Sequence, residues 1–221
     1  MAKVNPSFRK ELIKYGAKDF NACYNCGNCT AVCSLSTHDV SFPRELVRLS
    51  VLGLEDDIKS SLKPWECYYC GDCSKLCPQE ANPGELMMSL RRYLTAAYDW
   101  TGLSGLLYKS LSLTIILFVL VLAVVLQFAF SVDLNLDRMM HFGHLFEMIA
   151  IISVACIILL PNIARMWWFT ILKPKVSVPF KKYVTGISDL FIHMFTQKRA
   201  LGCDENQVRW FEHFILVLGY L

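Results

Sequence analysis

Hydrophobic and polar residues are distributed differently in the two halves of this chain. Residues 1–104 mix charged and apolar positions, whereas the long uncharged runs all follow Leu111. The first run, LSLTIILFVLVLAVVLQFAF from Leu111 to Phe130, holds twenty residues without a charge. A helix of about 20 residues crosses the roughly 30 Å hydrocarbon core of a bilayer. The pattern therefore predicts a transmembrane helix at about residues 108–131.

A second apolar run extends over residues 145–160, with Glu147 as its one charged residue. The aromatic side chains of Trp167, Trp168 and Phe169 follow it, and aromatic rings are typical of membrane interfaces. We therefore expect a second span at about residues 142–169. The alternative for both runs is a pair of buried helices in a soluble protein.

A third apolar segment, WFEHFILVLGYL, begins near residue 209 and reaches the last residue given. Twelve residues are too few to cross a bilayer. We expect this segment to open a third span, and the chain as given to be part of a longer protein.

The first hundred residues read as helical. Pro43 and Pro83 each stand where a first helical residue is expected, followed by an acidic residue in the first turn. Apolar residues at helical spacing follow both prolines: Leu46, Val47, Leu49, Leu90 and Leu94. We predict an all-α fold, with one domain in residues 1–100 and a transmembrane helical bundle in residues 101–221.

Composition and charge narrow the class of protein. The chain is 54% hydrophobic, and its net charge of +3 is too small to favour nucleic-acid binding. Residues 1–20 have no apolar core of the kind that secretory signals contain. The connection 173–209 is rich in lysine and arginine, whereas residues 131–143 hold one arginine and two aspartates. The positive-inside tendency then predicts a multi-pass protein of the cytoplasmic membrane, with residues 1–100 on the cytoplasmic side.

Eight of the ten cysteines form two sets that share the spacing C-x2-C-x2-C-x3-C. They are Cys23, Cys26, Cys29 and Cys33, and then Cys67, Cys70, Cys73 and Cys77. Cytoplasmic thiols stay reduced, so clustered cysteines there indicate metal binding rather than disulfides. This spacing is typical of iron-sulfur proteins, and Gly27 and Gly71 let each loop turn tightly. Cys156 is expected to be a buried apolar residue and Cys203 to have no role.

In two-cluster ferredoxins of this spacing, the fourth cysteine of each set binds the other cluster. We therefore assign one 4Fe-4S cluster to Cys23, Cys26, Cys29 and Cys77, and the other to Cys67, Cys70, Cys73 and Cys33. Structural zinc is the alternative, although it usually takes two separated C-x2-C pairs. Pro78 follows the second set as the iron-sulfur motif expects, but Ser34 replaces the proline after the first.

The motifs of residues 23–95 resemble the C subunit of heterodisulfide reductase over nearly the whole first domain. The resemblance rests on CYNCGNCTAVC, SFPRELVRLSVLGLEDDI, KPWECYYCGDCSKLCP and PGELMMSLRRYL. It implies an α-helical ferredoxin that carries electrons through two 4Fe-4S clusters. Members of that family are usually soluble, whereas this chain continues into apolar segments.

Three histidines lie at or within the apolar segments: His141, His144 and His213. Ionisable groups there are costly and are candidates for function, here as ligands of haem b. The alternative for each is an interfacial histidine with ordinary hydrogen bonds. DLFIHMFTQKRALG followed by RWFEHFILVLGY resembles the cytochrome b subunits of heterodisulfide reductase and of respiratory nitrate reductase, which favours His213. His144 is preferred to His141 because it lies deeper in the second span.

The combination resembles the C subunit of the quinone-interacting membrane-bound oxidoreductase complexes. That resemblance implies a membrane electron-transfer subunit between menaquinone and cytoplasmic subunits that hold flavin and iron-sulfur centres, linked to adenylylsulfate reduction. No nucleotide or flavin motif is visible, so we expect no substrate chemistry beyond quinone in this chain. The alternatives are a membrane-anchored docking ferredoxin without haem or quinone site, and the equivalent subunit of a heterodisulfide- or sulfite-linked complex.

Overall fold

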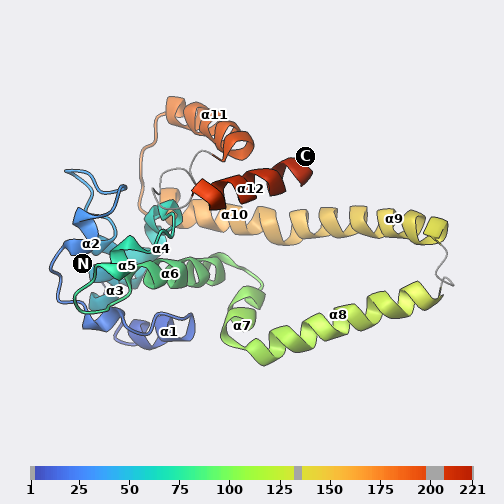
Figure 1. Ribbon diagram of the computed structural model, residues 1–221, viewed down its shortest axis with the longest axis horizontal. Coiled ribbons are helices and arrows are strands. Elements are labelled where there is room, and N and C mark those ends of the chain that lie inside the picture. The colour runs from blue at the N-terminus through green and yellow to red at the C-terminus, as the bar shows by residue number, and fades with distance from the viewer. Residues whose placement is uncertain (1–2, 132–135, 198–206, 221) are drawn as a thin grey trace. The chain divides into compact units, whose positions relative to one another are not determined.

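A computed structural model describes residues 3–131, 136–197 and 207–220 (Figure 1). Its regular structure in these ranges is helical, with no strand, so the predicted all-α fold is confirmed. The α-helices are α1 (Phe8–Lys14), α2 (Asn28–Ala31), α3 (Arg44–Leu52), α4 (Glu55–Ser60), α5 (Asp72–Lys75), α6 (Pro83–Tyr98), α7 (Leu103–Lys109), α8 (Leu111–Ser131), α9 (Leu136–Val154), α10 (Leu160–Trp167), α11 (Phe180–Thr196) and α12 (Gln207–Tyr220).

The chain divides into two compact units. One comprises Met1–Arg91 together with Thr170–Leu221, and the other comprises Arg92–Phe169. The first unit contains all eight cysteines of the two sets, and the second contains the two long apolar helices.

The hydrophobic core of the first unit lies under α1, α3 and α6. Phe8 and Leu12 of α1 are fully buried, as are several apolar residues of the other two helices: Leu46, Val47, Leu86, Met87 and Leu90. Full burial of such a side chain contributes roughly 1.5–3 kcal/mol. The expected inward positions Leu46, Val47, Leu90 and Leu94 are buried, and Leu49 is half-buried.

The two prolines occupy different helix positions. Pro83 is the first residue of α6, as predicted. Pro43 lies one residue earlier than expected, in the capping position before α3. Both positions suit proline, because an N–H at the start of a helix has no intrahelical partner to lose.

Two long helices dominate the second unit. The chain runs along α8 and returns along a helical stretch from Leu136 to Leu172, which contains α9, α10 and two π-helical turns (Figure 1). Both stretches are long and apolar enough to cross a membrane, by length and composition. Among the 18 most apolar consecutive residues of each stretch, 6% are buried in α8 and none are buried in the second stretch. They therefore do not form the buried core of the described protein.

The π-helical turn Ala155–Leu159 lies just before Pro161. Proline has no N–H, so it cannot donate to the carbonyl four residues earlier, which belongs to Ile157. The indole Nε1–H of Trp100 donates to this carbonyl at 2.6 Å. The Trp100 amide also donates to the side-chain oxygen of Asn162 at 3.2 Å. A tryptophan from the loop after α6 thus satisfies an acceptor that the proline leaves open.

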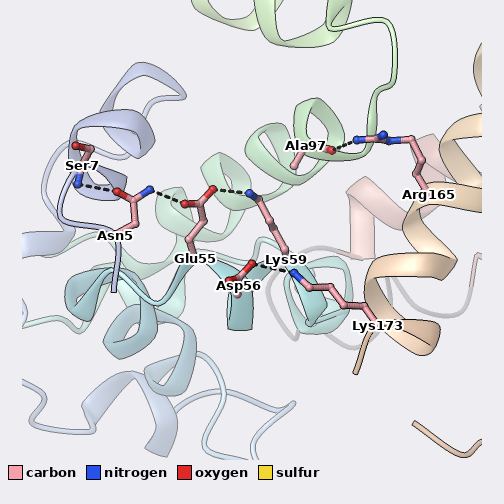
Figure 2. A network of polar contacts seen from close by, with 8 residues as sticks. All are labelled: Asn5, Ser7, Glu55, Asp56, Lys59, Ala97, Arg165 and Lys173. Carbon is pink, nitrogen blue, oxygen red and sulfur yellow. Dashed lines mark hydrogen bonds and ion pairs between the residues drawn. The ribbon is translucent and has the colours of Figure 1, made fainter. Parts of the chain in front are cut away.

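The carboxyl end of α6 belongs to the second unit, where a side chain of α10 contacts it. Arg165 donates from Nε to the carbonyl of Tyr98 at 2.8 Å. Its Nη2 donates to the carbonyl of Ala97 at 3.2 Å, the bond drawn in Figure 2. The last carbonyls of a helix have no intrahelical donor, and a cation there also complements the helix dipole. Arg165 of α10 therefore supplies donors to the last carbonyls of α6.

Asp99 organises the start of α7. Its carboxylate accepts from the Thr101 amide at 2.9 Å, the Thr101 hydroxyl at 2.6 Å and the Ser104 amide at 2.7 Å. Burial acts to raise the pKa of Asp99, but hydrogen bonds from Thr101 and Ser104 outweigh it and lower the pKa below its usual range. The carboxylate is thus held in its charged form as a helix cap.

Polar contacts also fix the surface of α4 in the first unit. The side chain of Asn5 bridges the Ser7 amide and Glu55, which in turn pairs with Lys59 (Figure 2). Asp56 forms an ion pair with Lys173 at 3.1 Å. This pair links α4 to the segment that follows residue 172.

Candidate iron-sulfur site

The two cysteine loops are built alike. Gly27 and Gly71 stand immediately before α2 and α5, with φ of +93° and +89°. This backbone conformation favours glycine, because a Cβ atom would be strained there. No protein atom lies within 4 Å of a Cβ built on Gly71. The required conformation, rather than crowding by other residues, therefore accounts for glycine at this position.

Backbone amides point at cysteine sulfurs in both loops. The Asn25 amide donates to Sγ of Cys23, and the Tyr69 amide donates to Sγ of Cys67, each at 3.4 Å. Asn25 and Tyr69 both have positive φ, 67° and 58°. Such N–H···S contacts stabilise thiolate charge and raise the reduction potential of iron-sulfur centres.

Cys33 of the first set lies with three cysteines of the second. A cavity beside α5 is lined by Cys33, Cys67, Cys70 and Cys73, and Phe42 and Met87 supply apolar walls. The side chains of Phe42 and Met87 are buried. Four thiols from two distant segments thus surround one space that is shielded by apolar residues.

Cys77 of the second set lies toward the first set. A hydrogen bond with Cys26 and the charge of Cys26 are the main reasons that the pKa of Tyr24 is raised, followed by burial and then by the charge of Cys77. The short helices α2 and α5 pack against each other. The Asn28 side chain donates to the carbonyl of Leu76, next to Cys77, at 3.4 Å. Cys33 therefore lies with the second set, and the residue before Cys77 contacts the first set.

Burial opposes negative charge at the cysteines. Cys29 and Cys73 are buried, and burial is the main reason that the pKa of each thiol is raised, to about 12 for Cys73. Burial likewise raises the pKa of Cys33 and Cys67. Buried thiolates need compensating positive charge, which a metal centre supplies while displacing the protons. The donor set fits 4Fe-4S clusters, whose usual ligands are four cysteine thiolates.

Sequence reasoning missed two arginines that hold the loops. Arg91 of α6 donates to the carbonyls of Pro64 at 2.8 Å, Trp65 at 3.2 Å and Cys67. Arg44 of α3 donates to the side chain of Asn25 at 2.7 Å. Each loop therefore rests against a guanidinium from a helix that follows its cysteines. Their position in the helix after each set was the one available sequence signal.

Among the described residues, no three histidine, cysteine or acidic side chains lie close enough to hold a single metal ion. His141 and His144 are exposed on α9, and His213 is exposed on α12. His144 and His213 belong to different units, and His141 shares its helix with His144. None of these three histidines therefore faces another of them from a second helix of its own unit. Cys156 is exposed rather than buried, and Cys203 lies outside the described residues.

Comparison with known proteins matches residues 22–82 to the family of the 4Fe-4S dicluster domain. A protein of Archaeoglobus profundus that is named as like the heterodisulfide reductase C subunit is 32% identical over 90 residues, which are 40% of this chain and 48% of that protein. The second iron-sulfur C subunit of the CoB–CoM heterodisulfide reductase of Methanocaldococcus jannaschii is 33% identical over 97 residues, or 40% of this chain and 52% of that protein.

The C subunit of the H2:CoB-CoM heterodisulfide, ferredoxin reductase of Methanothermobacter thermautotrophicus is 27% identical over 77 residues, 35% of this chain and 42% of that protein. The chain spans about half the length of the first two relatives. All three are heterodisulfide reductase subunits or are named as like one. The N-terminal part of this chain is therefore an iron-sulfur domain of the 4Fe-4S dicluster type, like that of the heterodisulfide reductase C subunit.

Proposed function

We propose that this chain is a membrane electron-transfer subunit. It passes electrons between the menaquinone pool, through haem b and two 4Fe-4S clusters, and cytoplasmic flavoprotein partners linked to adenylylsulfate reduction. The observation that most supports an electron path in this chain is the cavity where Cys33 meets Cys67, Cys70 and Cys73. This cavity is lined by cysteines of both sets, which supports a domain that holds two clusters near each other.

The residues of the domain have distinct roles in this proposal. Cys23, Cys26, Cys29 and Cys77 hold one cluster, and Cys67, Cys70, Cys73 and Cys33 hold the other. Bound clusters supply one-electron transfer. The amides of Asn25 and Tyr69 stabilise sulfur charge, and Arg91 fixes the Cys67 loop and adds positive charge beside it. Phe42 and Met87 exclude water from the space at Cys33.

Membrane placement rests on α8 and on the helical stretch from Leu136 to Leu172. Their apolar side chains are widely exposed: Phe118 is 69% exposed, and Phe146 is 73% exposed. Apolar surface of this extent is costly in water and is satisfied in a lipid bilayer. We propose that both stretches cross the cytoplasmic membrane, with the iron-sulfur domain on the cytoplasmic side.

For haem b, the chain offers His144 and His213, with His141 as the second choice for the first site. His141 and His144 come from one helix, so each proposed haem needs its other imidazole from another helix. The support for haem is the resemblance of these segments to cytochrome b subunits.

The test is composition analysis of the purified full-length complex. We expect about eight non-haem irons and as much acid-labile sulfide per chain, and a reduced-minus-oxidised visible spectrum with sharp b-type haem bands. Cluster absorbance without haem bands would instead support a membrane-anchored docking ferredoxin. Zinc without inorganic sulfide would refute the electron-transfer proposal altogether.

A heterodisulfide-linked function is the second candidate, because the matching relatives are named for heterodisulfide reductases. The two candidate functions differ in the oxidant that should reoxidise the reduced clusters. Reoxidation of the dithionite-reduced complex by a menaquinone analogue supports the quinone-linked function. Reoxidation by a heterodisulfide, and not by the quinone, supports the alternative.

A further inference from the structure

The helix α11 has one continuous apolar face. At about 100° per residue, eight apolar side chains fall within an arc of about 140°. The polar residues Thr185, Ser188 and Asp189 lie outside this arc. The eight residues of the apolar face are Phe180, Tyr183, Val184, Ile187, Leu190, Phe191, Met194 and Phe195.

The described protein does not cover this face. Its side chains are between 39% exposed, for Met194, and 80% exposed, for Phe180. The helix α12 contacts α11, and Trp210 donates to the carbonyl of Thr196 at 3.1 Å, at the end of α11. This contact leaves the apolar face open. A continuous exposed apolar surface of this kind marks an interaction site.

The charges around α11 and the length of this helix indicate what covers its apolar face. Lys175, Lys181 and Lys182 gather at the start of α11, and Lys198 and Arg199 follow its end in the sequence. The one acidic residue of α11, Asp189, lies opposite the centre of the apolar face. An apolar face flanked by cations is typical of helices that lie in the surface of anionic membranes. With 17 residues, α11 is about 25 Å long, too short and too charged to cross a bilayer.

The chain also keeps α11 near a membrane. Seven residues, 173–179, connect the long helical stretch ending at Leu172 to Phe180. The eight Cα–Cα steps from Leu172 to Phe180 reach at most about 29 Å. If the stretch crosses the bilayer, the first turn of α11 cannot lie farther than this from the end of the span.

We propose that α11 is an in-plane membrane helix. Its apolar face enters the boundary between headgroups and acyl chains, and its lysines contact the phosphates of anionic lipids at the cytoplasmic surface. This inference rests on the membrane placement in the proposed function. It adds a second, peripheral attachment beside the spans.

Photo-crosslinking in the full-length complex tests the proposal. The complex is placed in nanodiscs of phosphatidylcholine with phosphatidylglycerol, and p-benzoylphenylalanine replaces Phe191 on the apolar face or Asp189 on the polar face as the matched control. A third probe at Val121, in the middle of α8, reports on the span. We expect several-fold more lipid adduct from position 191 than from position 189, and strong lipid adduct from position 121.

The lysines are tested with the probe kept at position 191. The variant with Lys175→Gln, Lys181→Gln and Lys182→Gln is expected to lose lipid adduct several-fold in nanodiscs that contain phosphatidylglycerol, with little change in phosphatidylcholine alone. An unchanged yield in both lipids would overturn the charge part of the proposal.

The three probes separate the possible failures. Lipid adduct at position 121, with protein adducts or no excess lipid at position 191, overturns the in-plane helix and leaves the membrane spans standing. Protein adducts at position 191 would show that a second copy, another protein of the complex or a later segment covers the face. Absence of lipid adduct at position 121 overturns the membrane placement itself, and the in-plane helix with it.

Discussion

Cys33 and Cys77 are the residues that we propose to bind the cluster of the other set. Cys33 lines the cavity of the second set, and Leu76, next to Cys77, accepts a hydrogen bond from Asn28 of the first loop, where α2 packs against α5. A cysteine that belonged only to its own loop would not line the cavity of the other.

Replacing Cys33 tests this exchange. Because Cys33→Ala removes a thiolate beside Cys67, Cys70 and Cys73, we expect loss or conversion of that cluster and a fall of up to about four irons per chain. Electron paramagnetic resonance of the reduced complex measures which signal is lost, and Cys77→Ala is expected to remove the other one. Cys156→Ala, in the apolar unit, serves as control. Loss of the same signal in both variants would contradict the exchange.

Arg91 is expected to tune the second cluster. Its guanidinium donates to three carbonyls of the loop that contains Cys67, and its charge favours the thiolate of Cys67. Since reduction adds negative charge, Arg91→Gln should lower the reduction potential of the cluster at Cys67. A redox titration followed by electron paramagnetic resonance measures the change.

Two variants separate charge from support of the loop. Arg91→Lys keeps the positive charge but loses the forked hydrogen bonds, so its potential should stay closer to that of the wild type. Arg48→Gln, at an exposed position of α3, should leave the potential unchanged. An equal shift in the Lys and Gln variants would exclude charge as the cause.

The sequence identifies the cysteines but not the arginines, for a physical reason. Ligand spacing is a local property of the loop, so it is visible in eleven residues. The contacts of Arg91 and Arg44 depend on how α6 and α3 pack against loops that lie about twenty residues away in the sequence. Only the folded chain brings these groups together.

At the scale of elements, the long helices were predictable and their irregularities were not. α8 follows from an uncharged run whose length matches a bilayer, and the structure places its start at Leu111. Pro161 signals a break in the second stretch. The donor that satisfies Ile157 comes from Trp100, which is remote in sequence and therefore invisible to a local pattern.

A double-mutant cycle tests the Trp100 contact. Trp100→Phe removes the indole donor and leaves the Ile157 carbonyl open, which should cost about 1 kcal/mol of stability where water cannot replace the bond. Pro161→Ala supplies an N–H to that carbonyl, so in its presence Trp100→Phe should cost less. Thermal unfolding of the complex in lipid nanodiscs measures all four proteins.

The control for this cycle is Trp168→Phe, at an exposed tryptophan in the same helical stretch. The stability change caused by Trp168→Phe should be the same with proline or alanine at position 161. Additive effects of Trp100→Phe and Pro161→Ala would show that the indole and the missing amide are energetically independent.

At the scale of the whole molecule, the chain combines a small iron-sulfur domain with apolar helices that the rest of the described residues does not cover. Composition predicted this combination, because the cysteine spacing and the uncharged runs occupy separate stretches of sequence. The division into two units is harder to predict from the sequence. Residues after Phe169 belong with the N-terminal part because of contacts such as the ion pair between Asp56 and Lys173. Pairing between residues so far apart leaves no periodic pattern.

Membrane insertion can be tested with one charge. Val121→Arg places a cation in the middle of α8, which costs about 2.5–3.5 kcal/mol for a helix at the bilayer centre. We expect less of this variant in the alkali-washed membrane fraction, measured by immunoblot against total protein. Leu106→Arg, on the exposed surface of α7, is the matched control and should remain in the membrane. Equal recovery of both variants would argue against α8 as a span.

The proposed exchange of last cysteines between the two loops bears on how the protein matures in the cell. In the proposed assignment neither loop supplies all four ligands of one cluster. The first cluster delivered by a maturation factor would then be held in part by a loop whose position depends on the second cluster. The first cluster delivered would then position ligands for the second. Preparations of the wild-type protein should contain mainly molecules with no cluster or with both, whereas Cys33→Ala and Cys77→Ala should yield less cluster-containing protein.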